Sequence, residues 1–423
     1  MPNRALAEWL TLLESRHPSE IELGLGRVNN VWQRLQTTSG IKPSIAITVA
    51  GTNGKGSCIA SMQALLLQHG YTVGMFTSPH FLLYNERICL AGKPVSDQLI
   101  VNAFAEIEEV RGDISLTYFE FGTLAALLIF RDASPDVMLL EVGLGGRLDA
   151  INIIDADVAV VTSIALDHQD WLGDTREAIA GEKIGIARAK RPLIIGEQDY
   201  PCGFEQMVAE TGADALYIGR DFSFTDEPSF RVNLIAKNGP MHIDQLPRAG
   251  LLPINKTLAL QALLAAGLEL NSRDSRNALE SVELTGRHQT LSYKGIKIIL
   301  DVAHNPAAAS ALAQNLAGAE RRTLAVASVL EDKDWAGIVL AMGNVVDDWF
   351  IAQISDSTRA SKGHSLLEVV YNAGQSGQLL ESIEQALDSA LEQATAEDRI
   401  VVFGSFHTVA AVLNIILAEV SSE

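Results

Sequence analysis

Apolar runs that suit β-strands alternate with helical patterns along most of the chain. Residues 44–50 (SIAITVA) form a largely apolar run, and residues 56–70 have the apolar spacing of a helix that ends at a glycine. The runs 136–142 and 157–164 are apolar almost throughout, as expected of strands buried on both faces of a sheet. This alternation predicts a parallel α/β architecture.

The alternation of strand and helix patterns is interrupted in one region and then resumes. Between 200 and 250 short polar and apolar segments alternate, and an Asn-Gly pair at 238–239 predicts a hairpin, so we expect a β insertion there. Strand and helix patterns resume near residue 295. We therefore expect a first domain over 1–287, a linker over 288–294 and a smaller domain over 295–423.

Length and charge narrow the possible functions. A chain of 423 residues is long for one domain, so two or three are expected. Fifty-two acidic and 32 basic residues give a net charge of −20, which argues against nucleic acid or an anionic membrane as the main partner. Any anionic ligand must be held by a local site.

Cysteine usage and hydropathy indicate the compartment. Cys58, Cys89 and Cys202 show no CxxC pairing, which favours a reducing environment over a disulfide framework or a zinc site. No apolar run approaches the roughly 18 residues of a membrane span, and the first residues lack a signal-peptide core. We expect a cytoplasmic protein that does not enter a membrane.

The stretch TVAGTNGKGSCIA at 48–60 differs from the usual phosphate-binding loop G-x-x-x-x-G-K-[ST]. Gly56 stands between Lys55 and Ser57, and Val49 occupies the place of the first glycine. The stretch still follows a predicted strand, opens a predicted helix and has glycines that let backbone N–H groups approach an anion. A glycine-rich turn with an incidental lysine is the alternative.

With this loop, the expected fold is α/β, with an N-terminal P-loop-type parallel-sheet ATPase domain and a smaller C-terminal Rossmann-like α/β domain. The sequence motif GTNGKGS resembles the nucleotide loop of the Mur ligase superfamily, whose members place one residue between the lysine and the metal-binding hydroxyl. Within it the chain most resembles the folylpolyglutamate synthase and dihydrofolate synthase family. The resemblance spans nearly the whole chain apart from 200–250 and rests on LGLGRV, TSPHFLLYNERI, TYFEFGTLAAL, LEVGLGGRLDA, TSIALDHQDWLG, GEKIGIA, GRHQ, DVAHNPAAA, DKDW and GSFHTVA.

The resemblance implies a magnesium site. Ser57, Glu141 and His168 match the family's Mg²⁺ ligands, and Lys183 matches a lysine that is carbamylated and holds a second Mg²⁺. From the residues alone, Glu141 also suits a cap for the following turn, and a lone histidine is more often structural because Mg²⁺ prefers oxygen ligands. Lys183 would otherwise be read as a solvated helix lysine.

The resemblance also implies the contacts of ATP. Asn255 would face the adenine, Arg287 the phosphates, and Asp301 the nucleotide from the smaller domain. Without the resemblance, Arg287 suits a linker salt bridge and Asp301 a strand-end cap. The implied nucleotide contacts are Asn53, Gly54, Lys55, Gly56, Asn255, Arg287 and Asp301.

A third set of positions matches the family's contacts to dihydropteroate. Aromatic stacking and a carboxylate that accepts from ring N–H groups suit a pterin. The alternative for Phe119 and Phe121 is core packing, which we expect of one of them. The matching residues are Ile21, Glu22, Leu23, Thr117, Tyr118, Phe119, Glu120, Leu148, Asp149 and Ala150.

The implied activity is ATP-dependent amide ligation. ATP and Mg²⁺ would activate the carboxylate of dihydropteroate or of a reduced folate, and L-glutamate would then displace phosphate. Lys55, Lys183 and His168 are the expected catalytic residues, and the enzyme is expected to be a monomer that binds no nucleic acid.

Three alternatives stay open at this point. Another Mur-type ligase would join an amino acid to a different carboxylate, but a cell-wall ligase predicts a UDP-binding domain, and about 45 residues before the loop are too few. A nucleotide switch would want N-K-x-D, and NKTL at 255 lacks the aspartate. A degenerate scaffold would be expected to lose Lys55, Glu141 or His168.

Overall fold

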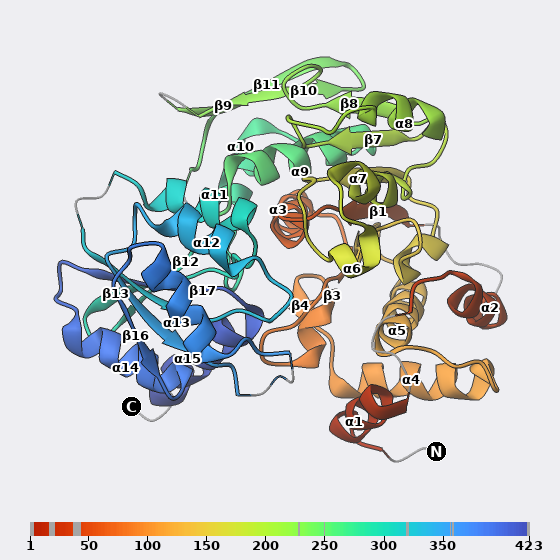
Figure 1. Ribbon diagram of the computed structural model, residues 1–423. Helices are drawn as coiled ribbons and strands as arrows, with labels where there is room; N and C mark the ends of the chain where they lie inside the picture. Colours follow the sequence, from red (N-terminus) through yellow and green to blue (C-terminus); the bar gives the residue numbers. More distant parts are fainter. Residues whose placement is uncertain are drawn as a thin grey trace. The chain divides into compact units, whose positions relative to one another are not determined.

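The computed structural model describes residues 4–16, 22–36, 44–226, 229–248, 250–318, 321–355, 357 and 359–420 (Figure 1). The chain divides into two compact units, Met1–Val282 and Glu283–Glu423. Each unit contains an α/β sheet of its own, which confirms the expected fold class.

The main sheet of the first unit has eight strands in the order β4-β3-β2-β5-β1-β6-β7-β8. The strands from β2 to β8 in this order are parallel, whereas β3 and β4 are antiparallel to their neighbours. The carboxyl ends of the parallel strands therefore share one edge. The strands are β1 (Ile45–Ala50), β2 (Val73–Phe76), β3 (Ile88–Leu90), β4 (Lys93–Pro94), β5 (Val137–Glu141), β6 (Val158–Val161), β7 (Pro192–Ile195) and β8 (Asp214–Tyr217).

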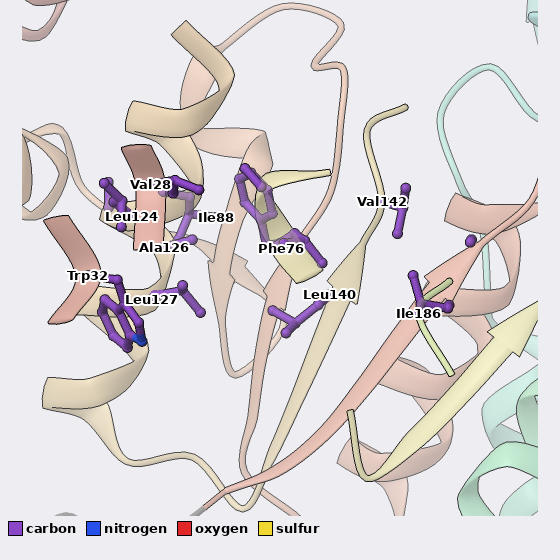
Figure 2. Close-up of a cluster of buried hydrophobic side chains, with 14 of the residues drawn as sticks. Val28, Trp32, Phe76, Ile88, Leu124, Ala126, Leu127, Leu140, Val142 and Ile186 are labelled. Atoms are coloured by element: carbon purple, nitrogen blue, oxygen red, sulfur yellow. The ribbon is translucent and has the colours of Figure 1, made fainter. Parts of the chain in front are cut away.

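Helices cover both faces of this sheet, which explains the continuous apolar runs. Along β5, Leu140 joins a core cluster that includes Phe76 of β2 and Leu124 of α5, as Figure 2 shows. Val137 and Leu139 alternate with Leu140, are fully buried and lie outside that cluster. Helices α3 (Lys55–Gln68), α9 (Pro253–Ala265) and α10 (Ser272–Glu280) pack together, and α3 and α9 contact the main sheet.

The core cluster that contains Leu140 also draws on the other helices of the first unit. The helices that contribute to it are α1 (Leu6–Arg16), α2 (Gly26–Leu35), α4 (Asp97–Arg111), α5 (Tyr118–Ala133), α6 (Gln169–Leu172), α7 (Arg176–Ile184) and α8 (Phe204–Thr211). A 3-10 turn, η1, is formed by Tyr84–Arg87 just before β3.

A separate antiparallel sheet, called the side sheet, is formed by β9 (Ser223–Thr225), β10 (Phe230–Ala236) and β11 (Gly239–Leu246). The predicted hairpin is confirmed, because Ala236 pairs with Gly239 across the turn between β10 and β11. The insertion starts later than predicted. Residues 204–217 form α8 and β8, which extend the main sheet because β8 pairs in parallel with β7.

The second unit has six strands in the order β12-β13-β17-β14-β15-β16, all parallel except β12. The strands are β12 (Gln289–Tyr293), β13 (Ile296–Leu300), β14 (Thr323–Ala327), β15 (Asp348–Ala352), β16 (Gly377–Leu380) and β17 (Arg399–Phe403). The helices are α11 (Pro306–Leu316), α12 (Trp335–Met342), α13 (Gly363–Asn372), α14 (Ile383–Gln393) and α15 (Phe406–Val420). None of the helices described in either unit is long and apolar enough to cross a membrane.

The expected linker at 288–294 is wrong. Residues 289–293 form β12, which pairs with β13 in antiparallel register, and the units divide after Val282. The turn between the strands is Lys294-Gly295, and both residues have positive φ angles, 50° and 79°. Two positive φ angles are typical of a tight hairpin turn, so the segment belongs to the second unit.

We predict that Trp349→Ala destabilises the second unit. The Trp349 side chain is fully buried between Trp335 and Phe403, with ring centroids 5.6 and 5.8 Å away. Its removal should lower the free energy of unfolding by about 3–5 kcal/mol, measured by urea denaturation. Leu340→Ala on α12 is the control, because this side chain is 78% exposed and its loss should change stability by about 0.5 kcal/mol or less. Equal effects of the two changes would contradict this assignment of the core.

Candidate active site

The loop between β1 and α3 contains two glycines that no other residue can replace without strain. Gly51 and Gly54 have positive φ angles of 151° and 86°. A Cβ atom on Gly51 would collide with the Thr162 hydroxyl, and one on Gly54 would lie 2.5 Å from Asn255 Oδ1. The loop therefore runs between the end of β6 and Asn255, with space for backbone alone.

Hydrogen bonds fasten this loop to the segment that follows β6. The Thr162 hydroxyl donates to the Asn53 carbonyl at 2.6 Å, and the Asn53 N–H donates to Ser163 Oγ at 2.9 Å. The Thr52 hydroxyl donates to the Ala165 carbonyl at 3.1 Å and accepts from the Ala165 N–H at 3.0 Å. The loop conformation is thus set by the protein itself before any ligand arrives.

The loop leads directly into the N-terminus of α3, a helix of 14 residues. Gly54 is its N-cap and offers no side-chain cap, so the first helical N–H groups can meet an anion. The Lys55 ammonium lies over the loop and donates to the Gly51 carbonyl at 2.9 Å. Gly56 and Ser57 follow in the first turn, where Ser57 is buried.

Lys183, in the last turn of α7, is buried with 4% of its surface exposed. The interpretation as a solvated surface lysine is therefore wrong. Burial lowers its pKa to about 7, and the charge of Lys55 lowers the pKa further, whereas Asp167 and Glu182 oppose the shift. Lys55 and Lys183 thus act on each other electrostatically, although 128 positions separate them in the sequence.

Asp149 connects the loop electrostatically to the predicted pterin stretch. Burial raises the pKa of its carboxyl to about 6, while backbone N–H donors and the charge of Lys55 oppose the rise. The Leu144 N–H donates to Asp149 Oδ2 at 2.8 Å, and the Ile151 N–H donates to Oδ1 at 3.0 Å. The charge of Lys55, in the nucleotide loop, therefore acts on the carboxylate of Asp149, a residue that we expect to contact dihydropteroate.

Glu141 ends β5 at the same sheet edge as the loop. In the register it is the partner of Val49 on β1, and it is 5% exposed. Its Oε2 accepts the Ser78 N–H at 3.1 Å. The sequence reasoning did not select Ser78, although this serine follows β2 closely, as Glu141 ends the neighbouring β5.

His168 is half-buried and has a left-handed backbone conformation with φ 51°. It caps the short helix α6, and its N–H donates to Asp167 Oδ1 at 2.9 Å. Across the described part of the chain, no group of three or more His, Cys, Asp or Glu side chains is arranged to hold a metal ion. A metal beside Glu141 would therefore need other ligands as well, such as hydroxyls.

The first turn of α5 carries part of the predicted pterin stretch. Thr117 and Glu120 form a capping box, in which the Thr117 N–H donates to Glu120 Oε2 at 2.8 Å. Arg27 bridges the Glu120 carboxylate, at 3.1 Å, and the Glu22 carboxylate. The sequence reasoning missed Arg27, which joins two predicted residues from distant parts of the chain.

A second contact joins two groups of predicted dihydropteroate contacts, the one near residue 23 and the one at 148–150. The Gly24 N–H donates to the Leu148 carbonyl at 3.2 Å, and Leu23 immediately precedes it. Ala150 is buried and begins a 3-10 turn, η2 (Ala150–Ile153). Ile21 lies outside the described residues.

Phe119 and Phe121 have different environments. Phe121 is fully buried and packs on Phe104, at a centroid distance of 5.9 Å, so it belongs to the core. Phe119 is half-buried and lies 5.8 Å from Phe76. Tyr118, also half-buried, has the Arg87 guanidinium 5.4 Å from its ring centroid. We expected one of these two phenylalanines to belong to the core, and Phe121 does.

In the second unit, Arg287 and Asp301 lie close together where β13 ends. Asp301 accepts the His288 N–H at 2.8 Å and the Ala303 N–H at 2.9 Å. Burial raises its pKa, and the charge of Arg287 opposes the shift. The Arg287 guanidinium lies 5.2 Å from the Phe406 ring centroid. The two predicted residues therefore form one cluster.

Comparison with known sequences identifies proteins similar to this chain. Residues 286–406 match the family described as Mur ligase, glutamate ligase domain. The chain is 44% identical to the dihydrofolate synthase/folylpolyglutamate synthase of Escherichia coli K12, over 97% of this chain and 95% of that protein. It is 37% identical to the Haemophilus influenzae protein of the same name, over 96% of each.

Solved structures agree with the sequence comparison. The fold is similar to Escherichia coli FolC in complex with DHPP and ADP, with a TM-score of 0.92, 43% identity and 99% of both chains covered. It is also similar to a bifunctional folylpolyglutamate synthase/dihydrofolate synthase with Mn, AMPPNP and L-glutamate bound, with a TM-score of 0.90, 40% identity and 99% of both chains covered. This chain therefore belongs to the dihydrofolate synthase/folylpolyglutamate synthase family.

Proposed function

We propose that this chain is an ATP-dependent ligase that joins L-glutamate to dihydropteroate, forming dihydrofolate, and to reduced folates, forming folylpolyglutamates. The observation that carries the proposal is the loop before α3, which is bonded to the end of β6 and holds Lys55 at a helix N-terminus that has no side-chain cap. Relatives with DHPP and ADP, or with AMPPNP and L-glutamate, support the same substrates.

The reaction must overcome the poor reactivity of a carboxylate toward an amine. A carboxylate oxygen of the substrate attacks the γ-phosphorus of ATP, which releases ADP and forms an acyl phosphate. The glutamate amine then attacks the acyl carbon, and the tetrahedral intermediate expels phosphate to leave an amide. Lys55 and the first N–H groups of α3 neutralise and orient the phosphates during the first step.

A divalent cation fits the donors around Glu141. The buried Glu141 carboxylate offers the oxygen that Mg²⁺ prefers, and Ser57 and Ser78 are hydroxyl candidates, whereas the nitrogen of His168 is a less usual ligand. When bound, such an ion neutralises charge on the transferring phosphoryl group. We propose Ser57, Glu141 and His168 as ligands of one ion and modified Lys183 as a ligand of a second.

The state of Lys183 favours carbamylation. With its pKa lowered to about 7, a substantial fraction of the amine is neutral near neutral pH. The neutral nitrogen attacks the carbon of CO₂, a nitrogen–carbon bond forms and one proton is released, which leaves a carbamate. The buried cation thereby becomes a carboxylate-like oxygen donor, and its repulsion with Lys55 is removed.

Each unit by itself contains candidate contacts for the nucleotide. In the first unit Asn255 lies against Gly54 of the loop, which supports a contact to the nucleotide. In the second, Arg287 has a planar fork that matches phosphate oxygens, and Asp301 holds the turn beside it. The proposed enzyme acts in the cytoplasm as a monomer. A Mur-type ligase for another carboxylate is not favoured, because the relatives of highest identity named above carry the folate activities.

We predict that purified protein with Mg-ATP releases ADP only when a pterin acceptor and L-glutamate are both present. Dihydropteroate and a reduced folate monoglutamate are compared with no acceptor. Activity with both acceptors supports the bifunctional assignment. Release that depends on neither acceptor would contradict the proposed substrates.

Lys55→Met should lower kcat/KM by at least about 10²-fold, because the charge that stabilises the transferring phosphoryl group is lost. Steady-state kinetics measures this effect. Lys93→Met is the matched control, since Lys93 is an exposed lysine of the same unit and its loss should leave the rate unchanged. Comparable losses in the two variants would show that Lys55 has no special role.

Lys183→Ala should abolish activity, and short carboxylates such as formate should restore part of it by supplying the missing oxygen donor. In the wild-type protein, ¹³C-bicarbonate should give a carbamate signal in the NMR spectrum that Lys183→Ala lacks. The signal should grow as pH rises through about 7, because the neutral amine is the reactive form. An identical spectrum for the variant would refute carbamylation at this residue.

A further inference from the structure

Lys256, in the first turn of α9, is buried with 0% of its surface exposed. Burying an ammonium group costs free energy unless a hydrogen-bond partner compensates for lost water. The burial lowers the pKa of this lysine to about 8.

The buried ammonium makes a defined contact. Lys256 Nζ donates to the Pro247 carbonyl at 2.8 Å. Pro247 directly follows β11, which ends at Leu246, and α9 begins at Pro253. The hydrogen bond therefore spans the connection between the side sheet and α9, and ties the start of that connection to the first turn of the helix.

A second side chain links the same helix to the same sheet. Gln261 Oε1 accepts the Ile235 N–H at 2.9 Å, and Gln261 Nε2 donates to the Ile235 carbonyl at 2.9 Å. Gln261 is more than one helical turn beyond Lys256 and is also fully buried. Helix α9, drawn in green in Figure 1, therefore has two buried polar side chains bonded to the side sheet or the residue after it, and Lys256 is the one in its first turn.

The first turn of α9 also carries Asn255, whose side chain lies against the nucleotide loop. The Asn255 amide oxygen would be 2.5 Å from a Cβ on Gly54, and Gly54 is the N-cap of α3. Helices α3 and α9 pack against each other. A small displacement of the first turn of α9 would therefore move Asn255 relative to the helix N-terminus that receives the phosphates.

We propose that Lys256 is a positioning residue for the nucleotide: its hydrogen bond to Pro247 holds the first turn of α9, and with it Asn255, against the loop. Lys256 makes no contact with ATP in this arrangement and acts through its neighbour. The inference rests on the proposed function, in which Asn255 contacts the nucleotide.

The test compares K256M with Q261M. Both variants remove a buried polar link between α9 and the side sheet, and both should lower the melting temperature. K256M should raise the Kd and the KM for ATP about tenfold and change kcat by about twofold or less, as expected when ground-state binding is lost. Q261M should leave the Kd for ATP at the wild-type value. ATP binding is measured by isothermal titration calorimetry on the full chain.

A second variant separates the hydrogen bond from packing. K256Q keeps an N–H donor on a shorter side chain and should lose less affinity for ATP than K256M. Equal ATP affinities of K256M and Q261M, or of K256M and K256Q, would overturn the role of Lys256. Absence of ATP binding by the wild-type protein would instead overturn the proposed function itself, and with it this inference.

Discussion

The contact between the 51–54 loop and the end of β6 is the constraint on which the candidate active site depends. Asn53 is held through both its N–H and its carbonyl, and Gly51 lies so close to Thr162 that no side chain fits between them. These contacts fix the direction in which α3 begins. They also fix the position of Lys55, which lies within electrostatic range of Lys183 and Asp149.

The acidic composition explains why positive charge is needed locally at the candidate active site. A protein of net charge −20 attracts no anion by its overall field, so ATP must be bound by local positive charge. The half-buried Lys55 and the N-terminus of α3 supply this charge. Burial lowers the pKa of Lys183, and repulsion by the charge of Lys55 lowers it further. Conversion of Lys183 to a carbamate would relieve the repulsion and create an oxygen donor at the same point.

The local features were predictable from the sequence, and the long-range ones were not. The strand, loop and helix at 45–68 follow from apolar periodicity and glycine spacing, and the α/β alternation sets the fold class. Arg27 could not be found this way, because its role depends on a contact with Glu120 across 93 positions. The linker error at 288–294 has the same origin: QTLSY becomes a strand only through pairing with β13.

The position of Gly56 has a geometric consequence for the metal side of the site. Successive residues of an α-helix are rotated by about 100° around its axis, so the extra residue after Lys55 turns the next hydroxyl away from its usual direction. Ser57 is indeed buried in the first turn of α3. Ser78 provides another hydroxyl, in a residue whose N–H already donates to Glu141. A loop with this spacing keeps its lysine and helix N-terminus for phosphate, and the segment after the neighbouring strand β2 places Ser78 beside the Glu141 carboxylate.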